Sequence, residues 1–357
     1  MSLSIGIVGL PNVGKSTLFN ALTKNNVLAA NYPFATIEPN EGIVPVPDQR
    51  LEKLTELFNS QKTVPATVKF VDIAGIVKGA HEGEGMGNAF LSHIRETDAI
   101  AQVVRVFKDD DVLHVDNRIS PQDDIDIINA ELILADLQTL ENHQPKLARL
   151  AKSDPEAKKS MPVVEALIHS LNRGELAINS DQDLQLVKHL NLLTAKPFIY
   201  VFNQDEGGII DEAEQEKLKA MAPTDNVVFV SAKVEAEISE LNGDDAAIFM
   251  AEYGLRESGL ARLSRVGFET LGLQTYLTAG EKESKAWTIK QGYTAPQAAG
   301  VIHGDFERGF IAADVVNYDD LLTAQSWHKA REAGKVRTEG KTYVMKPDDV
   351  VEFKFNV

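Results

Sequence analysis

Residues 9–16 read Gly-Leu-Pro-Asn-Val-Gly-Lys-Ser, which is a complete phosphate-binding loop. The loop follows a short apolar strand, Ser4-Ile5-Gly6-Ile7-Val8, and precedes a stretch from Ser16 to Lys24 with the pattern of a helix. In this position the loop directs backbone N–H groups and the positive end of the helix at phosphate oxygens. The stretch therefore predicts a nucleotide-binding α/β domain of the P-loop type.

Individual roles follow from the residue types of the loop. Gly9 and Gly14 allow the backbone to curl around phosphate oxygens, and Lys15 reaches the β- and γ-phosphates. The hydroxyl of Ser16 is placed to hold Mg²⁺. The predicted nucleotide contacts of this segment are Asn12, Val13, Gly14, Lys15, Ser16 and Thr17.

Two further segments are expected at the γ-phosphate. Asp72-Ile73-Ala74-Gly75 closes an apolar strand, so Asp72 is predicted in the second shell of the Mg²⁺ and the Gly75 N–H at the γ-phosphate. In the loop from Asn31 to Thr36, the hydroxyl and carbonyl of Thr36 are expected to complete the Mg²⁺ coordination. The alternative for Thr36 is a plain surface threonine.

The catalytic residue is less well defined by the sequence. Ras-type enzymes place a water-orienting glutamine directly after Asp-x-x-Gly, whereas this chain has Ile76. The glycine-dense segment 79–88 is expected to become ordered when the γ-phosphate is present, and its His81 is the nearest candidate for catalysis. A loop histidine without a catalytic part is the alternative. Hydrolysis is therefore expected to be slow, or to depend on a partner.

Asn203-Gln204-Asp205-Glu206 occurs where a GTPase carries Asn-Lys-x-Asp. The aspartate of that motif accepts two hydrogen bonds from guanine, and Glu206 is one methylene too long for the same geometry. Asn203 can bond adenine at N7 and N6, and the methylenes of Gln204 can stack on the base. Ser231-Ala232-Lys233 is expected to line the base edge, with Ser231 and Ala232 as contacts. ATP should bind at least as well as GTP, unless the motif is an ordinary polar loop.

Composition limits the remaining possibilities. The chain has 357 residues, of which 43% are hydrophobic, so it can bury a large core in two or three domains. No stretch approaches the ~20 apolar residues of a membrane span, and no signal peptide precedes the first strand, so we expect a cytoplasmic protein without a membrane partner. The absence of cysteine excludes disulfides, thiolate metal sites and cysteine nucleophiles.

The net charge of −17 argues against a diffuse nucleic-acid-binding surface, and no recognition of DNA sequence is expected. Any contact with RNA must be local. One basic cluster near the C-terminus is a candidate for contact with ribosomal RNA, with a solvated charged face as the alternative. It consists of Lys329, Arg331, Lys335, Arg337, Lys341 and Lys346.

The organisation of the chain is that of an α/β protein with an insertion and a second domain. Residues 1–277 are expected to form the nucleotide-binding domain, interrupted by a helical hairpin at 121–194 whose exposed tip begins near Lys152. Its apolar residues include Ile125, Ile128, Leu132 and Ala135, then Leu184, Val187 and Leu190. Residues 278–357 are expected to form a small domain of short strands, at 286–289, 309–313, 342–345 and 351–355.

Taken together, the loop at 9–16, the run from Asp72 to Ala80, the helical insertion, the motif at 203–206 and the β-rich C-terminal segment resemble the YchF family of Obg-like ribosome-binding ATPases. The resemblance covers essentially the whole chain. It implies a P-loop domain with a coiled-coil insertion and a C-terminal TGS domain of β-grasp fold. It also implies ATP hydrolysis stimulated at the ribosome, with a hydrophobic residue replacing the usual glutamine.

Three functions remain open at this point. The first is an ATP-driven switch that acts on the ribosome in translation or stress response, with Mg²⁺ as cofactor. The second is a GTP-hydrolysing regulator of the Obg type. The third is a nucleotide-sensing binding protein in which hydrolysis is incidental.

Overall fold

β1 (Ser4–Val8) lies inside a six-stranded sheet with the strand order β2-β4-β1-β5-β6-β7. β1 pairs in parallel with β4 and β5, β5 with β6, and β6 with β7. β1, β5 and β6 are buried along their whole length, as expected for parallel strands covered on both faces. The strands are β2 (Glu41–Pro45), β4 (Thr67–Asp72), β5 (Ala99–Arg105), β6 (Phe198–Asn203) and β7 (Val227–Val230).

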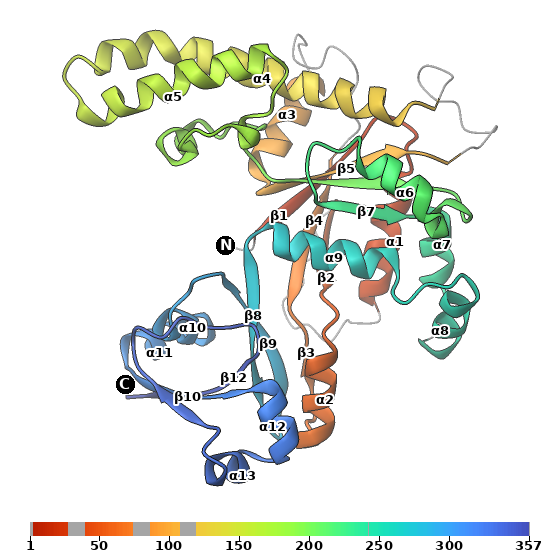
Figure 1. The fold of residues 1–357 in the computed structure, drawn as a ribbon, viewed down its shortest axis with the longest axis vertical. Coiled ribbons are helices and arrows are strands. Elements are labelled where there is room, and N and C mark those ends of the chain that lie inside the picture. The colour runs from red at the N-terminus through yellow and green to blue at the C-terminus, as the bar shows by residue number, and fades with distance from the viewer. Residues whose placement is uncertain (1–2, 28–39, 74–85, 108–118, 242, 357) are drawn as a thin grey trace. The chain divides into compact units, whose positions relative to one another are not determined.

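The computed structural model describes residues 3–27, 40–73, 86–107, 119–241 and 243–356. The chain separates into two units, of which the first is Met1–Val44 with Lys69–Val266 and the second is Pro45–Val68 with Gly267–Val357 (Figure 1). The functional domain boundaries given above, 1–277, 121–194 and 278–357, stay a prediction. In the described part of the chain, no helix is long and apolar enough to cross a membrane.

Helices connect the parallel strands of the first unit. α1 begins at Lys15 because the carbonyl of Gly14 accepts the first helical bond from Leu18 N at 3.0 Å. The α-helices of this part of the chain are α1 (Lys15–Val27), α3 (Met86–Glu96), α4 (Pro121–Leu150), α5 (Pro155–Asn172), α6 (Glu212–Lys219), α7 (Ala232–Ile238), α8 (Gly243–Glu252) and α9 (Gly259–Thr270). Short 3₁₀ turns are η1 (Ala177–Asn179), η2 (Leu184–Leu190) and η3 (Gly208–Ile210).

α4 and α5 form the long helical hairpin of the first unit (Figure 1). At its root, the buried Gln102 of β5 donates from Nε2 to the carbonyl of Asp124 at 3.3 Å. Asp136, also buried, accepts from Leu193 N at 2.9 Å and from Thr194 N at 2.7 Å. The hairpin is therefore fixed both to the sheet and to the segment that leads into β6.

The returning helix of the hairpin is not where the sequence pattern placed it. We expected apolar positions 184, 187 and 190 on that helix, but they lie in the 3₁₀ turn η2, where Val187 alone is buried. The returning helix is α5, whose Val163, Val164, Leu167 and Leu171 are buried. Its charged first turns resemble an exposed loop, which conceals the helical spacing of three and four that follows. The predicted exposed tip is confirmed at residues 152–156.

The second unit is built on a mixed six-stranded sheet with the order β11-β10-β12-β8-β9-β3. β10 and β12 are antiparallel, as are β8 and β9, while β12 and β8 run parallel. The strands are β3 (Thr63–Val64), β8 (Leu273–Ala279), β9 (Ser284–Lys290), β10 (Phe310–Asn317), β11 (Arg337–Glu339) and β12 (Asp349–Phe355). The helices are α2 (Gln49–Phe58), α10 (Ala295–Ile302), α11 (Gly304–Arg308), α12 (Tyr318–Ala324) and α13 (Trp327–Glu332).

One face of this sheet packs on α10. Ala295, Ala298 and Ala299 are completely buried there, and their small side chains admit the ring of Tyr276, whose hydroxyl donates to the carbonyl of Ala298 at 3.0 Å. The burial raises the pKa of the Tyr276 hydroxyl. The strand expected at 342–345 is wrong, because this segment makes only an isolated bridge from Val344 to Thr294. The P-loop sheet, the helical pair and the β-rich C-terminal unit confirm the predicted fold class.

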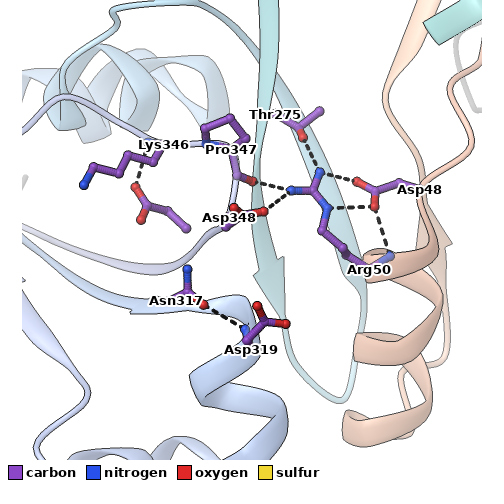
Figure 2. A network of polar contacts seen from close by, with 9 residues as sticks. Asp48, Arg50, Thr275, Asn317, Asp319, Lys346, Pro347 and Asp348 are labelled. Atoms are coloured by element: carbon purple, nitrogen blue, oxygen red, sulfur yellow. Dashed lines mark hydrogen bonds and ion pairs between the residues drawn. The ribbon is translucent and has the colours of Figure 1, made fainter.

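Arg50 holds α2 within the second unit (Figure 2). Its guanidinium binds the carboxylate of Asp48 through Nε at 2.9 Å and Nη2 at 2.7 Å. Nη1 donates to the carbonyl of Pro347 and to Asp348, both at 2.8 Å, and Nη2 reaches Thr275 Oγ1 at 3.2 Å. One planar cation thus links a segment near residue 50 with β8 and with the turn before β12.

Candidate functional site

The phosphate-binding loop turns through two residues in the left-handed backbone region. Asn12 and Gly14 both have positive φ, at 63° and 88°. A Cβ on Gly14 would lie 2.2 Å from Nδ2 of Asn203. Both the positive φ and this clash therefore exclude any residue other than glycine at position 14. The loop ends where α1 begins, with Ser16 and Thr17 exposed in the first turn of the helix.

Lys15 and Asp72 come together at the end of β4. The Nζ of Lys15 lies 2.5 Å from Oδ1 of Asp72, and both side chains are largely buried. The two residues predicted at the phosphates and at the Mg²⁺ shell are therefore direct neighbours. Their contact places one positive and one negative group at the same edge of the sheet.

Asn203 is a buried bridge between two loops. Its Nδ2 donates to the carbonyl of Val13 at 2.9 Å, and its Oδ1 accepts from the backbone N–H of Ala232 at 2.9 Å. Each end of the amide keeps one further hydrogen-bonding position, because an amide has two N–H groups and two lone pairs. Asn203 thus fixes the phosphate loop to the segment at 231–233 and retains the capacity to bond a base.

The neighbouring Gln204 is also buried, at 2% exposure, but its amide, unlike that of Asn203, makes no hydrogen bonds within the described part of the chain. Among the described residues, neither Oε1 nor Nε2 of Gln204 has a hydrogen-bond partner. A Cβ on Gly208 would lie 2.9 Å from Nε2, so the turn that follows packs directly against the amide. A buried amide without partners is costly, and this one lines a cleft.

Glu206 is engaged by side chains of the protein itself. Its Oε1 lies 2.8 Å from Lys233 Nζ, and its Oε2 accepts from the hydroxyl of Tyr253 at 3.3 Å. The hydrogen bond and charge of Lys233 lower the pKa of the Glu206 carboxyl below its ordinary value. Asp205 instead closes the local turn, accepting from Gly208 N at 2.9 Å. The Ser231 side chain caps α7.

A cleft of ≈ 1150 Å³ connects these groups. All the nucleotide contacts predicted from the sequence line it, except Val13, whose side chain is buried, and Gly75, which lies outside the described residues. The cleft lies along the carboxyl ends of parallel strands, where ligands of open α/β sheets bind. Phe107 also lines it, and we did not predict this residue, although it follows β5 as Asn203 ends β6.

Several predicted residues are not part of the structure described here. Thr36, Ile76 and His81 lie outside the described residues, as does Gly75. In the described ranges, no group of three or more histidine or acidic side chains is arranged to hold a metal ion. Ser16 and Asp72 do offer the oxygen donors that Mg²⁺ prefers, and such a site draws its other ligands from phosphates and water.

Two protein families match separate parts of the sequence. A family described as "50S ribosome-binding GTPase" matches residues 4–136. The C-terminal family of YchF GTPases, described as "Protein of unknown function (DUF933)", matches residues 273–356. The first match covers the phosphate loop and β4, and the second covers most of the mixed sheet.

Similarity to individual proteins extends over the whole chain. The Ribosome-binding ATPase YchF of Bacillus subtilis is 51% identical over 366 residues, covering 100% of both chains. That of Escherichia coli O157:H7 is 50% identical over 363 residues, with the same coverage. The solved structure of the Schizosaccharomyces pombe YchF GTPase is 37% identical and superposes with a TM-score of 0.89 over 99% of this chain and 98% of that one. The chain therefore belongs to the YchF family.

Proposed function

We propose that this protein is an Mg²⁺-dependent ATPase that binds the ribosome. The full-length identity of about 50% to proteins named ribosome-binding ATPases supports the activity and the partner. The cleft at the carboxyl edge of the sheet supports the location of the nucleotide. A ribosome-bound ATPase would act in the cytoplasm.

The phosphates are held at one end of the cleft in this proposal. Lys15 neutralises phosphate oxygens, and the N–H groups of residues 12–17 donate to them from the loop and the first turn of α1. Ser16 and Thr36 would hold the Mg²⁺, with Asp72 in its second shell. The ion supplies charge neutralisation at the phosphates. Because Lys15 contacts Asp72 at 2.5 Å, the nucleotide replaces a carboxylate as the main partner of the lysine.

The unpartnered amide of Gln204 carries the assignment of the base. Adenine presents a donor at N6 beside an acceptor at N1, and an amide offers the complementary acceptor and donor. Guanine needs an additional acceptor for its 2-amino group, and Glu206 is held by Lys233 instead. In this proposal the second N–H and the remaining lone pair of Asn203 bond adenine at N7 and N6. ATP is therefore bound at least as well as GTP.

Hydrolysis by the isolated protein is slow in this account. The position of the usual water-orienting glutamine is occupied by Ile76, and an aliphatic side chain does not orient water. We propose that binding to the ribosome brings His81, or the backbone beside it, into position to orient the attacking water. Binding of the partner then controls turnover.

Steady-state release of phosphate from ATP, measured with and without purified ribosomes, tests this proposal. The expected result is slow turnover alone and a clear acceleration with ribosomes. In the variant His81→Ala, loss of the acceleration would show that His81 positions the attacking water. If the acceleration is retained, the backbone or the partner positions the water instead. Wild-type turnover that ribosomes do not change would overturn the proposed function.

GTP hydrolysis is the second candidate, because the matching family at 4–136 and the Schizosaccharomyces pombe structure are both described as GTPases. It requires an acceptor for the guanine 2-amino group. Glu206 serves only if it leaves Lys233 and Tyr253. Binding of GTP and ITP separates the candidates, since ITP lacks the 2-amino group. A site that reads this group binds GTP more tightly than ITP, and the proposed ATP site does not.

A further inference from the structure

Charge is segregated along the helical hairpin of the first unit. The part of α4 from residue 121 to 145 contains no lysine or arginine, whereas residues 146–159 reverse the sign. The acidic part carries Asp123, Asp124, Asp126, Glu131, Asp136 and Glu141. The basic part carries Lys146, Arg149, Lys152, Lys158 and Lys159, with Asp154 and Glu156 as its acidic residues.

Both acidic residues of the basic part are engaged locally. Asp154 caps α5, accepting from the N–H of Glu156 at 2.9 Å, and Glu156 pairs with Lys159 at 2.9 Å. In the part of the chain that the structure describes, no carboxylate lies within 4.0 Å of the other four cations, all of which are exposed. We define the basic tip as Lys146, Arg149, Lys152 and Lys158.

Helix stability does not account for this arrangement. A cation in the last turn of a helix, such as Arg149 in α4, interacts favourably with the helix dipole. Lys158 lies close to the first turn of α5, where the same dipole disfavours a positive charge. The cations thus gather at the turn between α4 and α5, although the dipole favours positive charge at the end of α4 and disfavours it at the start of α5.

The hairpin also presents these cations away from the acidic parts of the first unit. Leu147 and Ala157 are buried where the helices pack, and residues 151–154 form the turn between them. α4 has 30 residues, which corresponds to a length of about 45 Å. The turn lies at the end of the hairpin remote from the sheet (Figure 1). Since the Debye length is about 8 Å at physiological salt, charges at the root of α4 are screened from a partner at the tip.

The C-terminal basic cluster predicted from the sequence is less able to bind phosphate than the basic tip, because half of its cations are already paired with carboxylates. Arg331 lies 3.0 Å from Asp314 and 2.9 Å from Glu352, so it is shared by two carboxylates. Lys335 pairs with Asp320 at 3.0 Å, and Arg337 pairs with Glu339 at 3.1 Å. The remaining Lys329, Lys341 and Lys346 are exposed without an ion pair in the described ranges, and they provide a matched control surface.

We propose that the basic tip binds the phosphate backbone of structured ribosomal RNA. This inference rests on the proposed ribosome binding and specifies its contact. Exposed cations without carboxylate partners neutralise phosphates, and they do so without reading sequence. The acidic remainder of the chain limits the contact to the projecting end of the hairpin. The partner surface is therefore RNA accessible to a narrow pair of helices.

Equilibrium binding of the full-length protein to purified ribosomes and, separately, to protein-free ribosomal RNA tests the inference. Both are measured between roughly 50 and 200 mM salt, a range over which phosphate contacts lose affinity steeply. The test variant carries Lys146→Ala, Arg149→Ala, Lys152→Ala and Lys158→Ala. One control carries Lys329→Ala, Lys341→Ala and Lys346→Ala, and another retains the charge with Lys146→Arg, Lys152→Arg and Lys158→Arg. Circular dichroism and ATP turnover without ribosomes verify that each variant is folded.

The tip variant is expected to bind both probes more weakly than wild type. The slope of log affinity against log salt should become shallower by about 3, because four cations are removed and each phosphate contact contributes about 0.7–0.9 to the slope. Both controls should bind within about twofold of wild type. Equal binding by the tip variant, or an equal loss in the C-terminal control, would overturn the inference while leaving ribosome binding intact. Loss of ribosome binding in the tip variant, with no wild-type binding to free RNA, would reassign the tip to an acidic protein surface. Wild-type binding to RNA but not to ribosomes would defeat the proposed function alone, and binding to neither would defeat both.

Discussion

Lys15 of the phosphate loop and Asp72 at the end of β4 form a direct ion pair, with 2.5 Å between Nζ and Oδ1. A phosphate and a metal ion change the partners of both residues, because Lys15 prefers the phosphate oxygens and Asp72 the hydrated metal. The pair therefore holds the two side chains in place before the nucleotide arrives. It also predicts that either side chain affects the other when it is replaced.

Lys15→Ala should weaken ATP binding by roughly 10- to 100-fold, since a hydrogen bond to a charged group contributes about 1.5–3 kcal/mol. The fold should be retained, because the lysine lines the cleft and is not part of the hydrophobic core. Isothermal titration with ATP and Mg²⁺ measures the loss. Lys69→Ala is the matched control, as it removes a lysine that pairs with Glu41 at 2.6 Å outside the cleft. ATP affinity equal to that of wild type would refute the assignment of Lys15.

The base assignment predicts a change of selectivity in the double variant Gln204→Lys with Glu206→Asp. This variant restores Asn-Lys-x-Asp, so the shorter carboxylate can accept both guanine bonds and the amide is lost. The ratio of ATP to GTP affinity should shift toward GTP by about tenfold or more. Competition against a fluorescent nucleotide measures the ratio, with Glu216→Asp at an exposed position of α6 as control. An unchanged ratio would show that other groups select the base.

His143 predicts a pH dependence of the helical hairpin. Burial, followed by the charges of His189 and Lys146, lowers the pKa of His143 below its ordinary value of 6.5. Its Nε2 has no partner among the described residues, and its ring contacts that of His189 with centroids 5.4 Å apart. The unfolded chain therefore binds more protons than the folded chain just below pH 6.5. Stability is complete above this pH and decreases as the pH falls through it.

Hydrogen exchange of α4 and η2, corrected for the intrinsic rate, should accordingly show less protection at pH 5.5 than at pH 7.5. The variant His143→Gln should lose most of this difference. His169→Gln, at an exposed position of α5, should retain it. The same pH dependence in wild type and His143→Gln would exclude His143 as its source.

Arg50→Lys should destabilise the second unit by about 1–3 kcal/mol, because a lysine cannot reproduce the forked contact with Asp48 and the bonds to Pro347 and Asp348. Lys53→Met, on the same helix but exposed, should change the stability little. Urea unfolding followed by Trp287 or Trp327 fluorescence, both of which lie in this unit, measures the difference. Equal midpoints for Arg50→Lys and wild type would show that the contacts of Arg50 contribute nothing measurable.

The sequence predicts much of this fold because its decisive signals are local. The phosphate loop specifies strand, turn and helix within about fifteen residues. Asn203 is predicted in the site because the motif at 203–206 stands where a GTPase carries Asn-Lys-x-Asp, and Ser231 because it directly follows an apolar strand. Phe107 carries the same signal, but its chemistry is not distinctive in a sequence.

Contacts between distant residues account for what the sequence did not predict. The pairing of Thr63 and Val64 with β9 joins residues more than two hundred positions apart, and no local pattern encodes it. Arg331 of α13 pairs with Glu352 of β12, 21 positions away and in a separate element. The unpartnered amide of Gln204 is instead a local feature, which depends on how the turn at Gly208 packs against it and which no sequence pattern encodes. The spacing of apolar residues along the sequence predicts none of these contacts.

Competition between ATP and GTP for the wild-type protein at fixed Mg²⁺ tests the central claim most directly. With labelled ATP bound, unlabelled GTP should displace it no better than unlabelled ATP, because in the proposed site the free amide of Gln204 pairs with adenine while Glu206 stays on Lys233. ITP and GTP should displace it equally. Displacement by GTP at concentrations about tenfold below those of ATP, with ITP weaker than GTP, would contradict the assignment of this chain as an ATPase.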